Sequence, residues 1–307
     1  MTFTNIICSA NECLTKVLVR GESSDFLDDQ FMHGTARFAD MLSKLARDLQ
    51  APPEDGTEFL MNEIKILEKC KGVTLPNFAP RRAFLAILSR YVDAVHAKPV
   101  VFIKEVCDYI QVVLTSVVTE CSENFPQIQS SIKRAGRSLI SKMKEQSVNR
   151  VTEIVQMEKM TDYTCSPEYM TVYTQKIVAQ ESFVAAVRNN SSTYPINAYG
   201  FVNVGLAHLR KYDSNLLRQA FDMKVRVDAY WTIVVRRIVD NLAMYLQFSV
   251  NNLVNSEFQK EMVKVGGGGE VERMMEESPL VASKRKKLKN SIKLLKESKE
   301  AVAAIVE

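Results

Sequence analysis

The amino-acid sequence predicts an all-α protein: an elongated antiparallel four-helix bundle with one further helix at the C-terminus. Two observations predict this class. The 307 residues include only 11 Gly and 9 Pro, whereas soluble proteins average about 7% Gly and about 5% Pro. Apolar residues also recur with a helical period over long stretches. Folds built from strands need frequent turn residues, so an all-β architecture is disfavoured.

The charge and composition exclude several classes of protein. With 40 Lys and Arg against 36 Asp and Glu, the formal net charge is +4, too small by itself to indicate nucleic-acid binding. The most apolar stretch, residues 100–118, contains Lys104, Glu105 and Asp108, so it does not predict a membrane span. The N-terminus lacks the pattern of a signal peptide. The six cysteines have no CxxC spacing, and because a secretory signal is not evident, we expect free thiols in the cytoplasm rather than disulfides.

The N-terminal part of the chain predicts shorter elements. A short helix followed by a polar segment is expected over residues 1–30. A helical pattern then begins near His33 and is interrupted by the Pro and Gly residues of 52–56. It resumes with Phe59 and ends at a loop over residues 72–80.

The strongest periodic signal lies between residues 84 and 121. One apolar stripe covers these 37 residues in ten steps, which is 3.7 residues per step and therefore a helical period. A helix of this length is about 55 Å long. Pro99 occupies the one step without such a side chain, and we expect it to kink the helix.

Two further long helices and a final one are expected after this stripe. One begins after Pro126. Residues 166–213, which are rich in polar, aromatic and turn residues, predict a long exposed loop with a short helix before it. A fourth long helix is expected over residues 214–262, followed by a glycine hinge at residues 266–269. A final helix is expected over residues 278–307.

The final helix carries apolar residues spaced by seven, a pattern that requires partner helices. These residues are Val281, Leu288, Leu295 and Val302, with Ile292 and Val306 beside them. If the other four helices pack together as a bundle, no helix of this chain remains to cover them. The pattern therefore indicates a partner outside the bundle.

Motifs for catalysis or cofactor binding are absent from the sequence. It contains neither a GxxxxGK[ST] phosphate-binding loop nor a GxGxxG motif. The three histidines, His33, His96 and His208, do not pair at metal-ligand spacing, and no Ser/His/Asp or Cys/His arrangement is evident. We therefore expect no enzyme active site, no metal and no cofactor in these residues.

Two segments have features beyond those of a plain helical bundle. The run Lys284–Lys289 is either a polyphosphate-binding or nuclear-localisation patch or a solvated helix face, and its alternation with apolar residues favours the solvated face. Residues 166–213 are either a tolerated insertion or a docking surface for a membrane or partner. The candidate docking residues are Arg188, Tyr194, Tyr199, Phe201, Arg210 and Lys211.

Long stretches of the sequence resemble the dynamin superfamily. LPNFAPRRAFLAILSRYVDAVHAKPVVFIKEV (75–106) and VVTECSENFPQI (117–128) are similar to its middle region. IVVRRIVDNLAMYLQFSVNNLV (233–254) and MMEESPLVASKRKKLKNSIKLLKESKEAV (274–302) are similar to its GTPase effector domain. The likeness covers roughly residues 15–307 and is nearest to the Mx-like dynamin-related proteins of plants.

The resemblance implies two parts that together form a stalk, which assembles into dimers and then into rings or helices. Residues 1–212 would be the middle region and residues 213–307 the GTPase effector domain. The final helix would belong to a bundle signalling element that connects the stalk to a GTPase domain. Its apolar seam would consist of Leu288, Ile292, Leu295 and Val302.

The family's GTPase domain, with its GTP and Mg²⁺, has no counterpart in this sequence, so the resemblance implies no catalysis by these residues. It does imply a self-assembly surface near the tip of the stalk. That surface would be formed by Met157, Met244, Tyr245 and Leu246.

The resulting hypothesis is a non-catalytic stalk that self-assembles and couples to a GTPase head for membrane remodelling or trafficking. Its partners would be copies of itself, a dynamin-type GTPase domain in the same or another protein, and membrane lipid or microtubules. Such a protein would be cytoplasmic or bound peripherally to membranes. One alternative is a stand-alone helical bundle that binds anionic membrane or nucleic acid through its basic tail, although nucleic acid is disfavoured. The other is a truncated regulator of full-length dynamin-related proteins.

Overall fold

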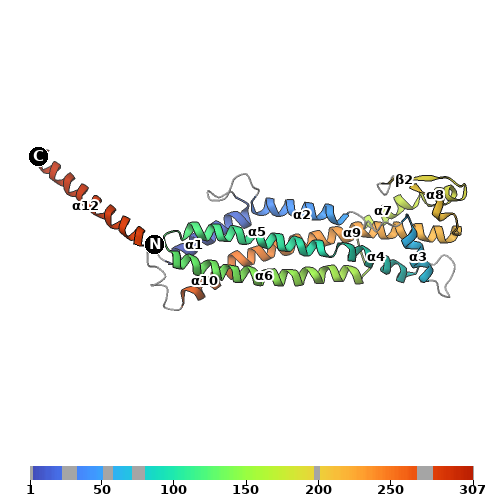
Figure 1. Ribbon diagram of the computed structural model, residues 1–307, viewed down its shortest axis with the longest axis horizontal. Coiled ribbons are helices and arrows are strands. Elements are labelled where there is room, and N and C mark those ends of the chain that lie inside the picture. Colours follow the sequence, from blue (N-terminus) through green and yellow to red (C-terminus); the bar gives the residue numbers. More distant parts are fainter. Residues whose placement is uncertain are drawn as a thin grey trace. The chain divides into compact units, whose positions relative to one another are not determined.

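The computed structural model describes residues 3–22, 33–50, 58–70, 80–196, 201–267 and 279–306. These residues are mostly helical and contain one two-stranded sheet (Figure 1). The all-α fold class is therefore confirmed. The chain divides into two compact units, each described separately below. Unit 1 comprises Met1–Phe38, Glu105–Glu145 and Leu246–Glu307, and unit 2 comprises Ala39–Lys104 and Gln146–Tyr245.

Unit 1 contains the N-terminal helix, parts of three long helices and the C-terminal elements. Its first elements are α1 (Phe3–Leu14) and the π-helical segment Thr15–Arg20. It includes the later part of α5 (Ala97–Cys121), the earlier part of α6 (Pro126–Met160) and the end of α9 (Ser214–Asn252). It ends with the π-helical segment Leu253–Glu257, α10 (Phe258–Gly266) and α12 (Pro279–Val306).

The core of unit 1 depends on apolar stripes and on one close helix contact. α1 buries Ile6, Ala10 and Leu14, which are spaced by four and therefore lie on one side of the helix. α5 and α6 approach each other at Gly136, where a β-carbon would come within 2.6 Å of Leu114 Cδ2. A larger residue at this position would require the Leu114 side chain to shift.

Unit 2 contains the remaining parts of α5, α6 and α9, together with shorter elements. The helices are most of α2 (Gly34–Gln50), α3 (Met61–Lys69), α4 (Arg81–Val95), α7 (Glu168–Ile177) and α8 (Gln180–Arg188). The antiparallel strands β1 (Thr193–Ile196) and β2 (Phe201–Gly205) pair Thr193 with Gly205 and Tyr194 with Val204. A 3₁₀ turn, Ala207–Leu209, follows.

The single kinked helix predicted over residues 84–121 is instead two helices. α4 and α5 are separated by a turn at His96, whose Nδ1 lies 2.6 Å from the Asp93 carbonyl oxygen. Pro99 lies in the first turn of α5, where a missing N–H breaks no helical hydrogen bond. The interruption expected at Pro99 therefore lies three residues earlier, at His96, and the expected kink stays a prediction.

The prediction of a long exposed loop with a short helix before it, over residues 166–213, was correct only in expecting a short helix. This segment forms α7, α8 and the β1–β2 hairpin (Figure 1). α8 buries Phe183, whose ring centroid lies 5.0 Å from that of Phe221 and 5.6 Å from that of Tyr194. The turn-forming residues belong to a hairpin, and both helices are too short for their periodicity to stand out in the sequence.

α9 begins at Ser214, the residue at which the sequence predicted the fourth long helix. Asp213 Oδ1 accepts hydrogen bonds from the backbone N–H groups of Asn215 at 2.7 Å and Leu216 at 3.1 Å. This side chain therefore satisfies two of the N–H groups that a helix start leaves without partners.

The C-terminal predictions fall partly outside the described residues. α10 ends at Gly266, and a turn at Gly267 follows it. The other two glycines of the predicted hinge, Gly268 and Gly269, lie outside the described residues. The predicted final helix corresponds to α12.

We expect Phe183→Ala to lower the free energy of unfolding by about 3–5 kcal/mol, because it removes a ring buried against three other aromatic rings. Urea denaturation followed by circular dichroism measures this change. Val178→Ala is the matched control, since Val178 is 81% exposed, and it should change stability by less than about 0.5 kcal/mol. Equal effects of the two variants would contradict the packing described for α8.

Candidate functional site

Large apolar side chains are exposed at several positions in unit 2. Single exposed apolar side chains are common on protein surfaces, whereas a group of them on one surface indicates an interaction site. Methionine is frequent among them, and its flexible, polarisable side chain adapts to the shape of a partner. The residues are Val101, Met157, Met160, Tyr163, Met170, Val178 and Met244.

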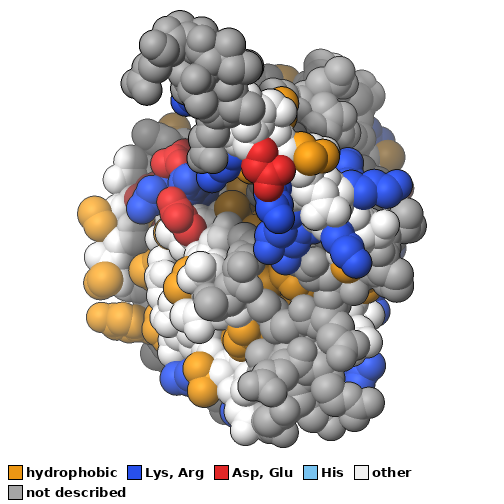
Figure 2. Space-filling view, turned by 90° about the vertical axis from the view of Figure 1, so that its left-hand side faces the viewer, with side chains coloured by type: hydrophobic (Ala, Val, Ile, Leu, Met, Phe, Trp, Pro, Cys, Tyr) orange, Lys and Arg blue, Asp and Glu red, His pale blue; other side chains and the backbone are white. Residues whose placement is uncertain are grey.

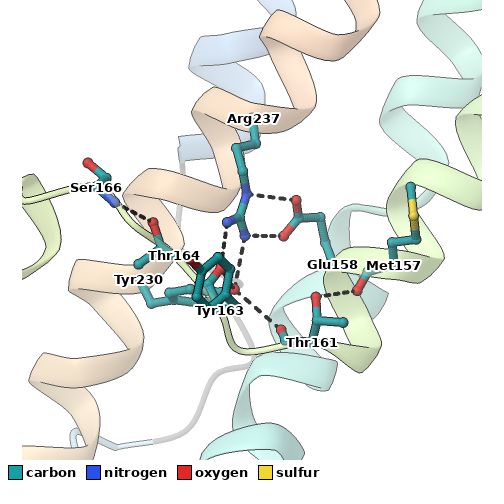
Figure 3. Close-up of polar contacts among 8 residues, drawn as sticks. All are labelled: Met157, Glu158, Thr161, Tyr163, Thr164, Ser166, Tyr230 and Arg237. Atoms are coloured by element: carbon teal, nitrogen blue, oxygen red, sulfur yellow. Dashed lines mark hydrogen bonds and ion pairs between the residues drawn. The ribbon is translucent and has the colours of Figure 1, made fainter.

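Met157 lies near the end of α6 and is 52% exposed, whereas the next residue, Glu158, is only 7% exposed. Successive residues of a helix point in directions about 100° apart. The Glu158 side chain points to α9, and Met157 lies on a different side of α6 (Figure 3). α6 therefore directs a charged residue inward and a methionine outward.

A salt bridge between Glu158 and Arg237 joins α6 to α9 (Figure 3). Arg237 Nε donates to Glu158 Oε1 at 2.9 Å, and Nη2 donates to Oε2 at 2.5 Å. Arg237 Nη2 also donates to Tyr230 Oη at 2.9 Å. Although burial opposes the charge, the hydrogen bonds with Glu158 and Tyr230 raise the pKa of the Arg237 guanidinium. The bidentate geometry makes this a strong pair.

The same network holds the segment that follows α6. Arg237 Nη1 donates to the Tyr163 carbonyl oxygen at 2.7 Å. Tyr230 Oη lies within donating distance of the carbonyl oxygens of Thr161, at 3.3 Å, and Tyr163, at 3.2 Å. Thr161 Oγ1 in turn donates to the Met157 carbonyl oxygen at 2.8 Å (Figure 3). Side chains of α9 therefore hold the backbone after α6, and Thr161 links that segment to the backbone of Met157.

Two exposed ion pairs lie beside this network. Arg81 donates through Nε and Nη2 to the two carboxylate oxygens of Asp162, at 2.7 and 2.6 Å. These hydrogen bonds lower the pKa of Asp162. Lys159 Nζ lies 2.7 Å from Asp93 Oδ1. Because Arg81 is exposed, water and salt screen its charge, so its pair orients the chain more than it stabilises the fold.

The residues predicted for self-assembly do not share one environment. Met157 and Met244 are 52% and 62% exposed. Tyr245 is half-buried, and its Oη accepts a hydrogen bond from Ser147 Oγ at 3.3 Å. Leu246 is only 4% exposed, so its assignment to an exposed surface was wrong. It continues the inward stripe of α9, four residues after buried Leu242. A role in assembly for the exposed residues stays a prediction.

The predicted docking residues in 166–213 contact their own unit. Arg188 Nε donates to Ser214 Oγ at 2.8 Å. Arg210 Nη2 donates to the carbonyl oxygens of Asn190 at 3.0 Å and Ser191 at 3.1 Å. These guanidinium groups are exposed, but their hydrogen bonds connect the ends of the α8–hairpin region.

The other residues of that predicted surface have different surroundings. Tyr194 Oη lies 2.5 Å from Ser182 Oγ, and Lys211 Nζ lies 5.1 Å from the ring centroid of Tyr212. Tyr199 and the side chain of Phe201 lie outside the described residues. A docking role for this region stays a prediction.

α12 exposes both charged and apolar side chains. Leu288, Ile292 and Leu295 are exposed, and the Val302 side chain lies outside the described residues. Within residues 282–299, eight Lys and Arg side chains are exposed against one carboxylate, Glu297. Lys and Arg side chains also gather in the upper part of the face drawn in Figure 2. The apolar positions form a narrow strip with basic residues beside it.

Several residues of the site were not identified from the sequence. Met160 and Met170 are exposed, as Met157 is. In the sequence they are only apolar residues near the end of a predicted helix and the start of a predicted loop, which does not indicate a surface. Glu158 and Arg237 are 79 positions apart, so no local pattern predicts their contact.

Sites for metals and membrane spans can be tested in the described residues. Among them, no group of three or more His, Cys, Asp or Glu side chains is arranged to hold a metal ion. In the same part of the chain, every helix is too short or too polar to cross a bilayer.

We expect Arg237→Met to lower the free energy of unfolding by about 3 kcal/mol, because it leaves the nearly buried Glu158 without its cation. Chemical denaturation measures the change. Arg236→Met is the neighbouring control: Arg236 pairs with Glu168 in a more exposed position, and its loss should cost less than about 1 kcal/mol. If both variants lose the same stability, the network of Figure 3 does not have the importance given to it here.

Comparisons with known proteins agree with one family. Residues 1–177 match the model of the dynamin central region, and residues 216–305 match that of the dynamin GTPase effector domain. Dynamin-related protein 4C of Arabidopsis thaliana is 63% identical across 100% of this chain, which corresponds to 47% of that relative. Interferon-induced GTP-binding protein MxE of Danio rerio is 20% identical over 81% of this chain and 36% of its own length.

The chain thus spans about half the length of these relatives or less. Since the central-region match alone covers more than half of the chain, the chain belongs to the dynamin family and carries its central region and GTPase effector domain.

Proposed function

We propose that this chain is a non-catalytic stalk and effector part of a dynamin-related GTPase and that it self-assembles through the exposed methionines of unit 2. The family match supports the first half of the proposal. The second half rests on one observation: Met157 and Met244 are exposed on long helices, while the residues Glu158 and Leu246 on the same helices are buried.

Association would be driven by the removal of these side chains from water. Full burial of one Met side chain stabilises a contact by about 1.5–3 kcal/mol. The Arg237 network already holds the end of α6 in place, so little backbone order would have to be gained on binding. A charge at Met157 would instead have to lose its water without a partner.

We propose α12 for the coupling to a GTPase domain. Leu288, Ile292 and Leu295 are exposed at a helical spacing, which a second helix can cover. The GTPase domain would come from the same protein or from another one, and it would supply the binding of GTP and Mg²⁺. Coupling of this kind would serve membrane remodelling or trafficking. A chain acting without such a domain would regulate assemblies of longer relatives.

The basic residues of α12 favour a second candidate function. Eight exposed Lys and Arg side chains beside an apolar strip are typical of helices that lie on anionic membranes. Sedimentation with phosphatidylserine vesicles distinguishes the two functions. Binding that falls steeply with salt and is lost when Lys284, Lys286, Lys287 and Lys289 are changed to Gln would support lipid binding. An absence of binding at low salt would exclude it.

We expect Met157→Asp to weaken self-association at least tenfold, about 1.4 kcal/mol, because a carboxylate replaces an apolar side chain within the contact. The measurement is the molar mass of the purified chain by light scattering across a range of concentrations.

Thr152→Asp is the matched control for this experiment. Thr152 is an exposed residue of the same helix in unit 2, five positions away and therefore on a different side of α6. It introduces the same charge and should leave the molar mass unchanged. If the Met157 variant associates as strongly as the parent chain, the proposed surface is wrong.

A further inference from the structure

Two cysteines from distant parts of the chain meet in unit 1. Cys13 is the penultimate residue of α1, and Cys121 is the last residue of α5. They are 108 positions apart in the sequence, yet the Cys121 side chain is close enough to raise the pKa of the Cys13 thiol. Ser9, one helical turn before Cys13, places its Oγ 3.7 Å from Cys121 Sγ. The same side of α1 therefore faces the end of α5 over a full turn.

The backbone that carries Cys13 is held by packing. Ile6, Ala10 and Leu14 of α1 are at most 2% exposed. A disulfide requires β-carbons about 3.5–4.5 Å apart and a sulfur–sulfur bond of about 2.05 Å. Ser9, on the same side of α1 as Cys13, already lies 3.7 Å from the Cys121 sulfur, so the bond would form between helix segments that face each other.

The environment of the pair permits reaction but does not favour it at neutral pH. Cys13 and Cys121 are half-buried, so a small oxidant can reach them. Burial, followed by the neighbouring Cys121, raises the pKa of the Cys13 thiol. The thiolate is the reactive form, so this shift slows attack by Cys13 at neutral pH and makes the rate of oxidation rise with pH.

The other four cysteines lack this arrangement. Among the described residues, Cys13 and Cys121 are the two cysteines that interact with each other. Cys8 and Cys165 are exposed, and Cys70 is half-buried. Cys107 is buried, and burial raises its pKa to about 11. The pair thus differs from single thiols that can only accept a small-molecule cap.

We propose that Cys13 and Cys121 form a reversible disulfide that joins α1 to the end of α5. The oxidant is a small-molecule disulfide such as oxidised glutathione. One protein thiolate attacks it, forms a mixed disulfide and releases one glutathione thiolate. The second protein thiolate then attacks the mixed disulfide at the protein sulfur and releases the second glutathione. Two protein thiols are oxidised, and one small-molecule disulfide is reduced to two thiols.

The bond would restrain α1 in a defined way. It closes a loop of more than 100 residues, which removes conformational freedom from the unfolded chain. It also prevents α1 from separating from α5. α1 packs on α10 as well, so the bond stabilises the contact between the first and later helices of unit 1. This inference is independent of the proposed assembly, because its test measures linkage and stability.

The test uses the full chain equilibrated with mixtures of oxidised and reduced glutathione. Free thiols are then alkylated, and peptides are mapped by mass spectrometry without reduction. We expect one linked peptide pair containing Cys13 and Cys121, which disappears on treatment with dithiothreitol. The oxidised chain should unfold at a temperature roughly 5 °C higher than the reduced chain.

Matched variants separate this bond from other thiol chemistry. Cys13→Ser and Cys121→Ser should each abolish both the linked peptide and the temperature shift, whereas Cys8→Ser should preserve both. Circular dichroism of the reduced proteins checks that each variant folds. Capping of Cys13 and Cys121 by glutathione without their linkage, or linkage through Cys8, would overturn the proposal. So would the absence of any linked pair at ratios that fully modify Cys8.

Discussion

The burial of one side of α9 is the constraint on which the structure of unit 2 depends. Residues such as Leu217 and Phe221 are fully buried along this helix, and charged groups lie between them. Lys224 and Asp228 form an ion pair at 3.3 Å with side chains only 14% and 12% exposed. Tyr91 Oη donates to Asp228 Oδ1 at 3.1 Å. Lys224 and Asp228 both lie on α9 and stay paired if the helix moves, but rotation or sliding would break the hydrogen bond from Tyr91 on α4 and would expose the buried stripe, so the helix has one favourable position.

The exposed methionines follow from that position. With α9 in place, Arg237 reaches Glu158 on α6 and the carbonyl oxygen of Tyr163 beyond it. α6 can then turn neither Glu158 outward nor Met157 inward without breaking a bidentate ion pair. The candidate surface is thus a consequence of polar contacts within unit 2. Its apolar side chains are exposed because the interior already requires the other side of the helix.

The sequence predicted the long helices well because their apolar stripes repeat over many turns. The sequence was a poor guide where a helix has few turns or where the effect of a residue depends on its position within a helix. Pro99 has opposite effects at the start and in the middle of a helix, and only the turn at His96 distinguishes the two cases. α8 contains too few turns to show a period. Leu246 was assigned to a surface by family resemblance, although its spacing from Leu242 already indicated burial.

The sequence by itself determined the all-α class, the positions of the long helices and the resemblance to the dynamin family. These properties follow from periodicity and motifs, which are local in the chain. Only the tertiary structure decided that Arg237 meets Glu158 and that Cys13 meets Cys121. Such contacts join residues 79 and 108 positions apart. They depend on how whole helices pack, and a helical period contains no information on which helix a given face will meet.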